Sequence, residues 1–351
     1  MTNTSSGSRV RAVILATILS ALSAGVVPCM AQVVPVPPTP PAPPAPPASE
    51  APRPPRAPRA PHLFGDEGVA RIDTTVAFSP SGTVDLSLVS GTMRVSTWDR
   101  SQVRVVASTS GERSLQFDAS NSHLSLEQSR DGRGSRNGSR NGGDVGSASY
   151  EVTLPAGARA TLSSVSGSID ASGVRGPVEV SAVSGSVKLR DLGSTLNVQG
   201  VSGSITVVNV ASDARVENVS GRISLTGVGG SASAETVSGP ILVTGVRGDR
   251  VHATSVSGSL DFAGPVSPTG RYDFETHSGT SNIRLASNAN VAISVETFSG
   301  SVSNDYPGAT RRRNSYSDDD GSNYEYVIGR GSGRLRVETF SGSVHISQGN
   351  Q

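Results

Sequence analysis

The sequence predicts an all-β fold, a single-chain parallel β-solenoid (β-helix) with coils of about 18 to 21 residues, preceded by a disordered proline-rich linker. The first observation is a Ser-Gly pair that returns at a fixed step along the chain. The second is the alternation of apolar and polar residues between these pairs, which is the period of a strand. The third is composition, because aromatic residues make up only 4% of the chain. The core must therefore be filled by Val, Ile, Leu and Ala.

The Ser-Gly pairs define the repeat. Five of them follow at steps of 18 residues, and later steps are 19, 21, 21 and 42 residues. A propeller is the rival all-β fold, but its blades need about 40 residues and a repeated aromatic signature that this chain lacks. We expect the glycines to turn the chain at stacked corners, since glycine adopts φ > 0 without a Cβ clash. The expected corner glycines are Gly91, Gly167, Gly185, Gly203, Gly221, Gly239, Gly258, Gly279, Gly300 and Gly342.

Apolar residues fall into columns when the repeats are aligned. One column contains Ile169, Val187 and Ile205, each two residues beyond its corner glycine. Stacking the coils turns such a column into an internal ladder with a spacing of about 4.8 Å. We expect the residue before each Ser-Gly pair to fill the corner of the same core. These residues are Val165, Val183, Val201, Val219, Val237 and Val256, replaced in later coils by His277, Phe298 and Phe340.

Residues 1–31 have the composition of a secretory signal peptide. Two arginines precede an apolar run from Ala12 to Val27, and Ala31 is a small residue suited to signal peptidase. Cleavage there would remove Cys29, the only cysteine, and leave no disulfide or thiol chemistry. A retained membrane anchor is the alternative. We expect an extracytoplasmic protein, located in the periplasm, at the cell surface or in the medium.

Residues 32–65 form the expected proline-rich extended linker, because proline fixes φ and removes hydrogen-bond donors. A stiff spacer is the first interpretation, and a wall-crossing stalk or a docking site for a proline-binding partner are the alternatives. The solenoid domain would then occupy residues 66–351. Polar stretches without an apolar pattern predict flexible loops at 130–147 and 305–326.

Two stretches resemble a known family. They are VSGTMRVSTWDRSQVRVVA, from Val89 to Ala107, and YEVTLPAGARATLSSVSGSID, from Tyr150 to Asp170. In these, and in the coils that follow, the chain resembles the bacterial β-strand-repeat family of putative adhesins, a domain of unknown function. The resemblance covers roughly Val69 to the end. It implies a parallel β-helix in an exported or membrane-tethered protein, and it brings no catalytic residues.

No sequence pattern predicts catalysis, a cofactor or a metal, and we expect a protein that is not an enzyme. The five histidines lack metal-ligand spacing, and neither a GxSxG motif nor a nucleotide-binding glycine pattern is present. One acidic alignment needs inspection, because β-helix enzymes that act on polysaccharides use clustered carboxylates. We expect it to be a solvated outward edge, with cation binding as the alternative. The column contains Glu217, Glu235, Glu275, Glu296 and Glu338.

Tyrosine and arginine gather in the loop 305–326, a composition typical of recognition surfaces. The alternative is that the tyrosines cover a widened coil that Phe298 and Phe340 fill. The candidate binding residues are Tyr306, Arg311, Arg312, Arg313, Tyr316, Tyr324 and Tyr326.

These observations favour a binding or scaffold module, adhesin-like, in the bacterial cell envelope. The expected partner is a cell-wall or surface glycan or another envelope protein. Nucleic acid is not expected, because the net charge is only +1. An envelope-stress or regulatory accessory module is the first alternative, and a polysaccharide-active β-helix enzyme is the second. The C-terminal coil has no obvious cap, so we also expect an open edge there and a homo-oligomer formed through it.

Overall fold

The computed structural model describes residues 69–110, 113–130, 146–312 and 322–349. The chain divides into two units, Met1–Ala60 and Pro61–Gln351, and every described residue belongs to the second. The predicted signal peptide and linker, most of loop 130–147 and part of loop 305–326 lie outside the described residues. The described part is built from strands without a helix, as predicted for an all-β protein. It therefore contains no helix long and apolar enough to cross a membrane.

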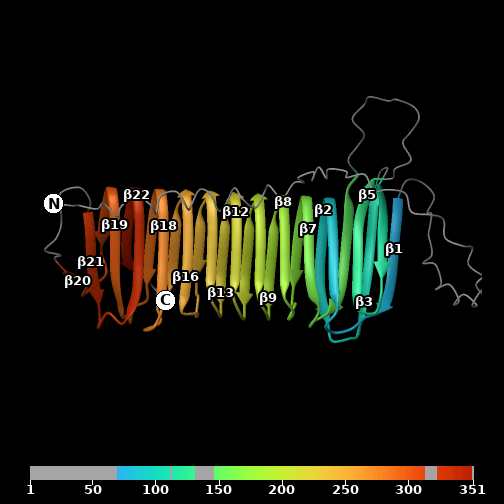
Figure 1. The fold of residues 1–351 in the computed structure, drawn as a ribbon, viewed down its shortest axis with the longest axis horizontal. Coiled ribbons are helices and arrows are strands. Elements are labelled where there is room, and N and C mark those ends of the chain that lie inside the picture. The colour runs from blue at the N-terminus through green and yellow to red at the C-terminus, as the bar shows by residue number, and fades with distance from the viewer. Residues whose placement is uncertain (1–68, 111–112, 131–145, 313–321, 350–351) are drawn as a thin grey trace, which may run out of the picture. The chain divides into compact units, whose positions relative to one another are not determined.

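Twenty-two strands follow one another along the described chain (Figure 1). They are β1 (Val69–Ala77), β2 (Thr83–Trp98), β3 (Gln102–Ser110), β4 (Arg113–Ala119), β5 (His123–Arg130), β6 (Ala148–Pro155), β7 (Arg159–Ser172), β8 (Val178–Ser184), β9 (Val187–Leu192), β10 (Leu196–Ser202), β11 (Ile205–Val210), β12 (Ala214–Ser220), β13 (Ile223–Val228), β14 (Ala232–Ser238), β15 (Ile241–Thr244), β16 (Arg250–Ser257), β17 (Leu260–Gly264), β18 (Arg271–Leu285), β19 (Val291–Asn304), β20 (Thr310–Arg312), β21 (Ser322–Ile328) and β22 (Gly333–Gln348).

Each coil has two arms that meet at the Ser-Gly corner. The first arm precedes the corner, as in β8, and the second arm follows it, as in β9. First arms pair in parallel with first arms, and second arms with second arms, so β8 pairs with β10 and β9 with β11. The long strands β2, β7, β18, β19 and β22 run through the corner and contribute to both arms. The result is a stack of parallel strands in which Val180 lies beside Val198, 18 residues later.

The core consists of the inward side chains of both arms. Ile169, Val187 and Ile205 are in register on neighbouring strands and fully buried, which confirms the predicted internal ladder. Burying a side chain of this size stabilises the fold by roughly 1.5–3 kcal/mol. Aromatic side chains fill the wider coils of the later repeats: the Phe262 ring centroid lies 5.7 Å from that of Tyr272 and 5.1 Å from that of Phe274.

Close approach between coils requires glycine at all ten expected corner positions, because an added Cβ would lie within 3.0 Å of a backbone atom. The expected positive φ is found at six of them and not at Gly167, Gly258, Gly300 and Gly342. Gly203 has φ of 121°, and a Cβ there would lie 1.8 Å from the carbonyl oxygen of Gly185 in the preceding coil. The Gly203 N–H in turn donates to the carbonyl of Ser220 at 3.1 Å. Side chains at this position would therefore push the coils apart and break the backbone hydrogen bonds between them.

The residue before each Ser-Gly pair is not in the core, so this part of the prediction is wrong. The valines of the first four coils, from Val165 to Val219, are 36–50% exposed. The reason is strand alternation: Val178, Val180 and Ala182 point inward along β8, so Val183 points outward. The third inward position of the arm is Ala182 in β8 and a buried polar residue, such as Asn218 or Thr236, in other coils.

The C-terminal coil does not end the stack, which overturns the expected open edge. The chain passes through β18 to β19, adds β20 and β21, and then returns, so that β22 lies between β18 and β19 with both neighbours in parallel register. At that end of the stack, β21 covers the first arm of β19 in antiparallel pairing, and β20 pairs with β21. At the opposite end, antiparallel β4 lies on β5, and β3 and β1 extend the second arms (Figure 1). Homo-oligomerisation itself stays a prediction.

Candidate binding surface

Apolar and aromatic side chains, exposed or half-buried, follow one edge of the stack at the Ser-Gly corner. We call this set the corner ladder. Its members stand on neighbouring coils in parallel register, about 4.8 Å apart. In spatial order they are Val165, Val183, Val201, Val219, Val237, Val256, His277, Phe340 and Phe298.

The ladder ends in a stack of three aromatic rings. The His277 and Phe340 ring centroids lie 4.8 Å apart with an 8° angle between planes, and those of Phe340 and Phe298 lie 4.9 Å apart at 4°. Phe298 is 60% exposed, so it does not fill a widened coil as expected, and neither is His277 packed in the core. The rings come from distant parts of the sequence and meet because β22 inserts between β18 and β19.

The predicted glutamate column lies beside the ladder on the outer face of the first arms. Its members are in register on β12, β14, β18, β22 and β19, interrupted by Thr254 on β16. Two arginines pair with it: Arg215 contacts Glu217 at 2.6 Å and Glu235 at 3.2 Å.

At the aromatic end of that column, Arg336 contacts Glu338 and also Glu296, the latter at 3.3 Å. Burial raises the pKa of Glu338. Arg336 opposes this effect, and the carboxylates of Glu275 and Glu296 add to it. Most of these carboxylates are thus engaged in ion pairs, and a separated acid and base of the kind a glycosidase needs is not formed in this column.

In the loop predicted to bind a partner, Arg311 is exposed as expected, but two of the predicted tyrosines are turned inward. Tyr306 is buried and donates its hydroxyl to the Ala286 carbonyl at 2.8 Å, and Tyr326 is buried as well, so neither is a surface contact. For these two the alternative, that tyrosines cover the core, is the one found. Tyr324 is half-buried beneath the Arg311 guanidinium, 4.9 Å from its ring centroid. The backbone of Arg312 belongs to β20. Arg313 and Tyr316 lie outside the described residues.

The four histidines in the described ranges do not assemble a metal site. His345 contacts the Ser303 hydroxyl through Nδ1 at 2.6 Å, and His252 contacts the Thr254 hydroxyl at 3.1 Å. His123 lies 3.6 Å from Asp85. Nowhere in the described ranges do three or more His, Cys, Asp or Glu side chains gather closely enough to hold a metal ion.

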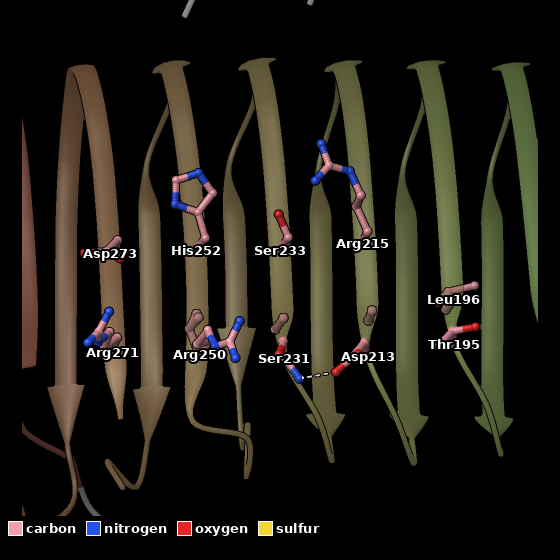
Figure 2. Close-up of a pocket in the computed structure, with 13 residues that line it drawn as sticks. Thr195, Leu196, Asp213, Arg215, Ser231, Ser233, Arg250, His252, Arg271 and Asp273 are labelled. Carbon is pink, nitrogen blue, oxygen red and sulfur yellow. Dashed lines mark hydrogen bonds between the residues drawn. The ribbon is translucent and has the colours of Figure 1, made fainter. Parts of the chain in front are cut away.

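A groove lies on the outer face of the first arms, at the end away from the ladder (Figure 2). Its volume is about 560 Å³, and its lining includes Arg250, Arg271, Ser231 and Asp213. The Asp213 carboxylate accepts the Ser231 N–H at 2.7 Å. Arg250 and Arg271 lie side by side on β16 and β18. The sequence analysis did not identify them, because their alignment becomes visible only when the first residues of the first arms are compared.

A second depression, of about 740 Å³, lies along the opposite corner near Trp98. Asp191 and Asn209 line it in the left-handed region, with φ of 55° and 57°, and the Asn209 amide donates to the Asp191 carboxylate at 2.9 Å. The Trp98 indole donates to the Gln102 carbonyl at 2.6 Å, and the Arg100 guanidinium lies 5.2 Å from its ring centroid. Two of the polar side chains that line this depression, Asn209 and Asp191, thus pair with one another.

The profile of the family described as Toastrack DUF4097 matches residues 83–347, which is most of the chain and nearly all of the stacked strands. The chain belongs to the Toastrack family. This family is a domain of unknown function, so membership agrees with the resemblance found in the sequence and leaves the activity open. No curated protein matches the chain.

Solved structures with a similar arrangement include proteins titled as putative adhesins. One from Bacteroides fragilis is 12% identical to this chain, and the match covers 79% of this chain and 97% of the Bacteroides chain, with a TM-score of 0.35. One from Parabacteroides merdae is 10% identical and covers 80% and 97%, with a TM-score of 0.34. A putative cell adhesion protein from Clostridium sporogenes is 11% identical and covers 80% and 100%, with a TM-score of 0.21. Likeness this low carries no argument about what this Toastrack chain binds.

Proposed function

We propose that the protein is an exported, non-enzymatic binding module of the bacterial cell envelope, adhesin-like in action, and that it holds its partner at the corner ladder. The observation that carries the proposal is the ladder itself, a contiguous row of apolar and aromatic side chains on the outer face, exposed at both ends and half-buried at Val237 and Val256. Soluble proteins rarely leave such a strip uncovered unless it makes a contact. The stack beneath it is rigid, because each coil is hydrogen-bonded to its neighbours on both sides.

The chemistry beside the ladder favours a protein partner. Five glutamates run parallel to the ladder over its second half, and among the described residues only Arg215 and Arg336 pair with them. The strip is therefore apolar at the corner and acidic along one side. A complementary surface would present apolar side chains next to lysine or arginine.

The ion-paired glutamates support a module without enzymatic activity. A carbohydrate-active site would require an acid and a base held apart on the same face. Export to the envelope rests on the predicted signal peptide, and fractionation of the producing cells would test it.

The experiment measures binding of the exported full chain to washed envelopes of the producing bacterium by co-sedimentation. The test variant carries Phe298→Ser and Phe340→Ser, which remove the exposed rings and leave the core untouched. We expect its apparent affinity to fall by about tenfold or more, because buried aromatic anchors dominate interface energetics. Protease treatment of the envelopes should abolish binding of the unchanged protein.

The matched control is Val208→Ser with Thr206→Ser, on the outer face of the second arm in β11. These changes also shorten half-buried side chains, but they lie away from the ladder, and binding should stay within about twofold. Equal affinity of the phenylalanine variant and the unchanged protein would rule out the ladder as the contact.

A further inference from the structure

We infer that the protein carries a second binding site, for an acidic polysaccharide, in the groove on the outer face of the first arms. The site is centred on a column of three arginines: Arg250 and Arg271 line the groove, and Arg334 lies beside Arg271 on the next strand. It goes beyond the proposed function, because it lies at the other end of the first arms from the corner ladder and would act independently of it.

The three arginines are in register on neighbouring strands. Arg250 of β16 lies beside Arg271 of β18, and Arg271 lies beside Arg334 of β22. Adjacent strands are about 4.8 Å apart, so the three backbone positions span about 10 Å. All three side chains are exposed, and Figure 2 shows Arg250 and Arg271 level with one another on adjacent coils.

Like charges at this spacing repel one another unless counter-charges intervene, since the separation is shorter than the screening length of about 8 Å at physiological salt. Other arginines of the same face have such partners: Arg215 and Arg336 each contact two glutamates. Within the described ranges, no carboxylate pairs with Arg250, Arg271 or Arg334. The column is therefore a row of exposed cations without an ion-pair partner among the described residues, so they are free to contact an anionic ligand.

The rest of the groove identifies the kind of anion. Its lining contains the carboxylates of Asp213 and Asp273, the Ser231 and Ser233 hydroxyls, and the His252 ring (Figure 2). A ligand must therefore offer negative charge to the arginines and hydroxyl donors to the carboxylates and ring nitrogens. Sugar units that carry a carboxylate satisfy both requirements, and a groove of about 560 Å³ has the size of an ordinary ligand site.

Other polyanions fit this lining less well. Inorganic polyphosphate has no hydroxyl donors at neutral pH to meet Asp213 and Asp273, whose charges would repel it. Single-stranded nucleic acid binds through aromatic platforms on which its bases stack, and apart from His252 the lining has no aromatic ring. A linear acidic polysaccharide could follow the arginine column from coil to coil, one acidic group after another.

The test is titration calorimetry of the full chain with oligogalacturonate, a sugar chain with a carboxylate on every unit. The probes for comparison are a neutral oligosaccharide of the same length, polyphosphate and single-stranded DNA. The test variant carries Arg250→Gln, Arg271→Gln and Arg334→Gln. The control variant carries Arg94→Gln, Arg159→Gln and Arg222→Gln, which remove the same charge from exposed positions elsewhere.

We expect oligogalacturonate to bind the unchanged protein and the control variant about equally, and the test variant about tenfold more weakly or worse. Undiminished binding by the test variant would overturn the proposal, and so would equal binding of the neutral oligosaccharide. Polyphosphate or DNA binding as tightly as oligogalacturonate would show a general anion site and overturn the sugar assignment. The Phe298→Ser/Phe340→Ser protein should bind oligogalacturonate normally, so failure here and failure of the corner ladder are told apart.

Discussion

Val198 and Val201 lie three residues apart in β10, in a strand of seven residues, and they have opposite environments. Val198 is fully buried, whereas Val201 is 36% exposed. The same amino acid thus builds the internal ladder at one position and the corner ladder at the other. The repeat motif therefore marks where the coil turns, while alternation along the strand decides which side chains reach the core.

The largest expected effect comes from placing the same charged residue at position 198 and at position 201, in separate variants. Val198→Asp buries a carboxylate between two coils that offer it no cation, and we expect the protein to lose its cooperative fold. Val201→Asp places the carboxylate in solvent, and the free energy of unfolding should change by less than about 0.5 kcal/mol. Circular dichroism during thermal unfolding distinguishes the two. Comparable stability of both variants would mean that the strand register is not the one described.

A second test concerns Gly203, the corner glycine between the two arms of its coil. Gly203→Ala puts a Cβ 1.8 Å from the Gly185 carbonyl oxygen in a backbone with φ of 121°, so we expect a loss of about 3 kcal/mol or more. Gly308→Ala is the matched control, because it has φ of 75° but no atom within 4 Å of the added carbon. Its cost should be about 1–2 kcal/mol, the strain of the left-handed region alone. Urea unfolding midpoints compare them, and equal losses would show that coil contact is unimportant at this corner.

A third test compares the two halves of the corner ladder. Phe340 stacks between His277 and Phe298, whereas Val201 has only aliphatic neighbours along the ladder. Aromatic pairs contribute about 0.5–1.5 kcal/mol beyond burial, so Phe340→Ala should cost about 1–3 kcal/mol. Val201→Ala should cost less than about 1 kcal/mol, because its side chain is already partly in water. If thermal melts give the two changes the same effect, the ring stack adds nothing to stability.

The sequence predicted the core and the repeat because both are local properties. Ile169, Val187 and Ile205 stand at one place in equal repeats, and alternation assigns them to the interior without knowledge of the full path. Val201 was assigned to the core because it belongs to the Val-Ser-Gly motif. Alternation gives the correct answer: Leu196 and Val198 point inward, so the odd-numbered Val201 points outward.

Other features depend on contacts between distant residues and could not be derived from one repeat. The insertion of β22 between β18 and β19 brings Phe340 next to Phe298, 42 residues earlier in the chain. The 42-residue step before Gly342 indicated an irregular coil, but it did not indicate the order in which β18, β22 and β19 pair. The arginine column needs the same three-dimensional alignment, since Arg271 and Arg334 become neighbours only through that insertion.

The smallest expected effect concerns Glu338, a member of the glutamate column that lies beside the corner ladder. Burial raises the pKa of Glu338 above that of the unfolded chain, so the folded state binds the proton more tightly and ionisation of the carboxyl costs stability. The stabilising contribution is fully present below the unfolded pKa of about 4.3 and is lost as pH rises through the folded pKa.

Glu338→Gln removes this titrating group and keeps a hydrogen-bond acceptor for Arg336. At pH 7 we therefore expect its Tm to rise by about 1 °C, and this advantage should vanish below about pH 4. Glu179→Gln, an exposed glutamate of β8 on the same outer face, serves as the control for loss of a charge. A Glu338→Gln advantage that persists at pH 3 would show that the gain comes from packing and not from relief of the buried carboxylate.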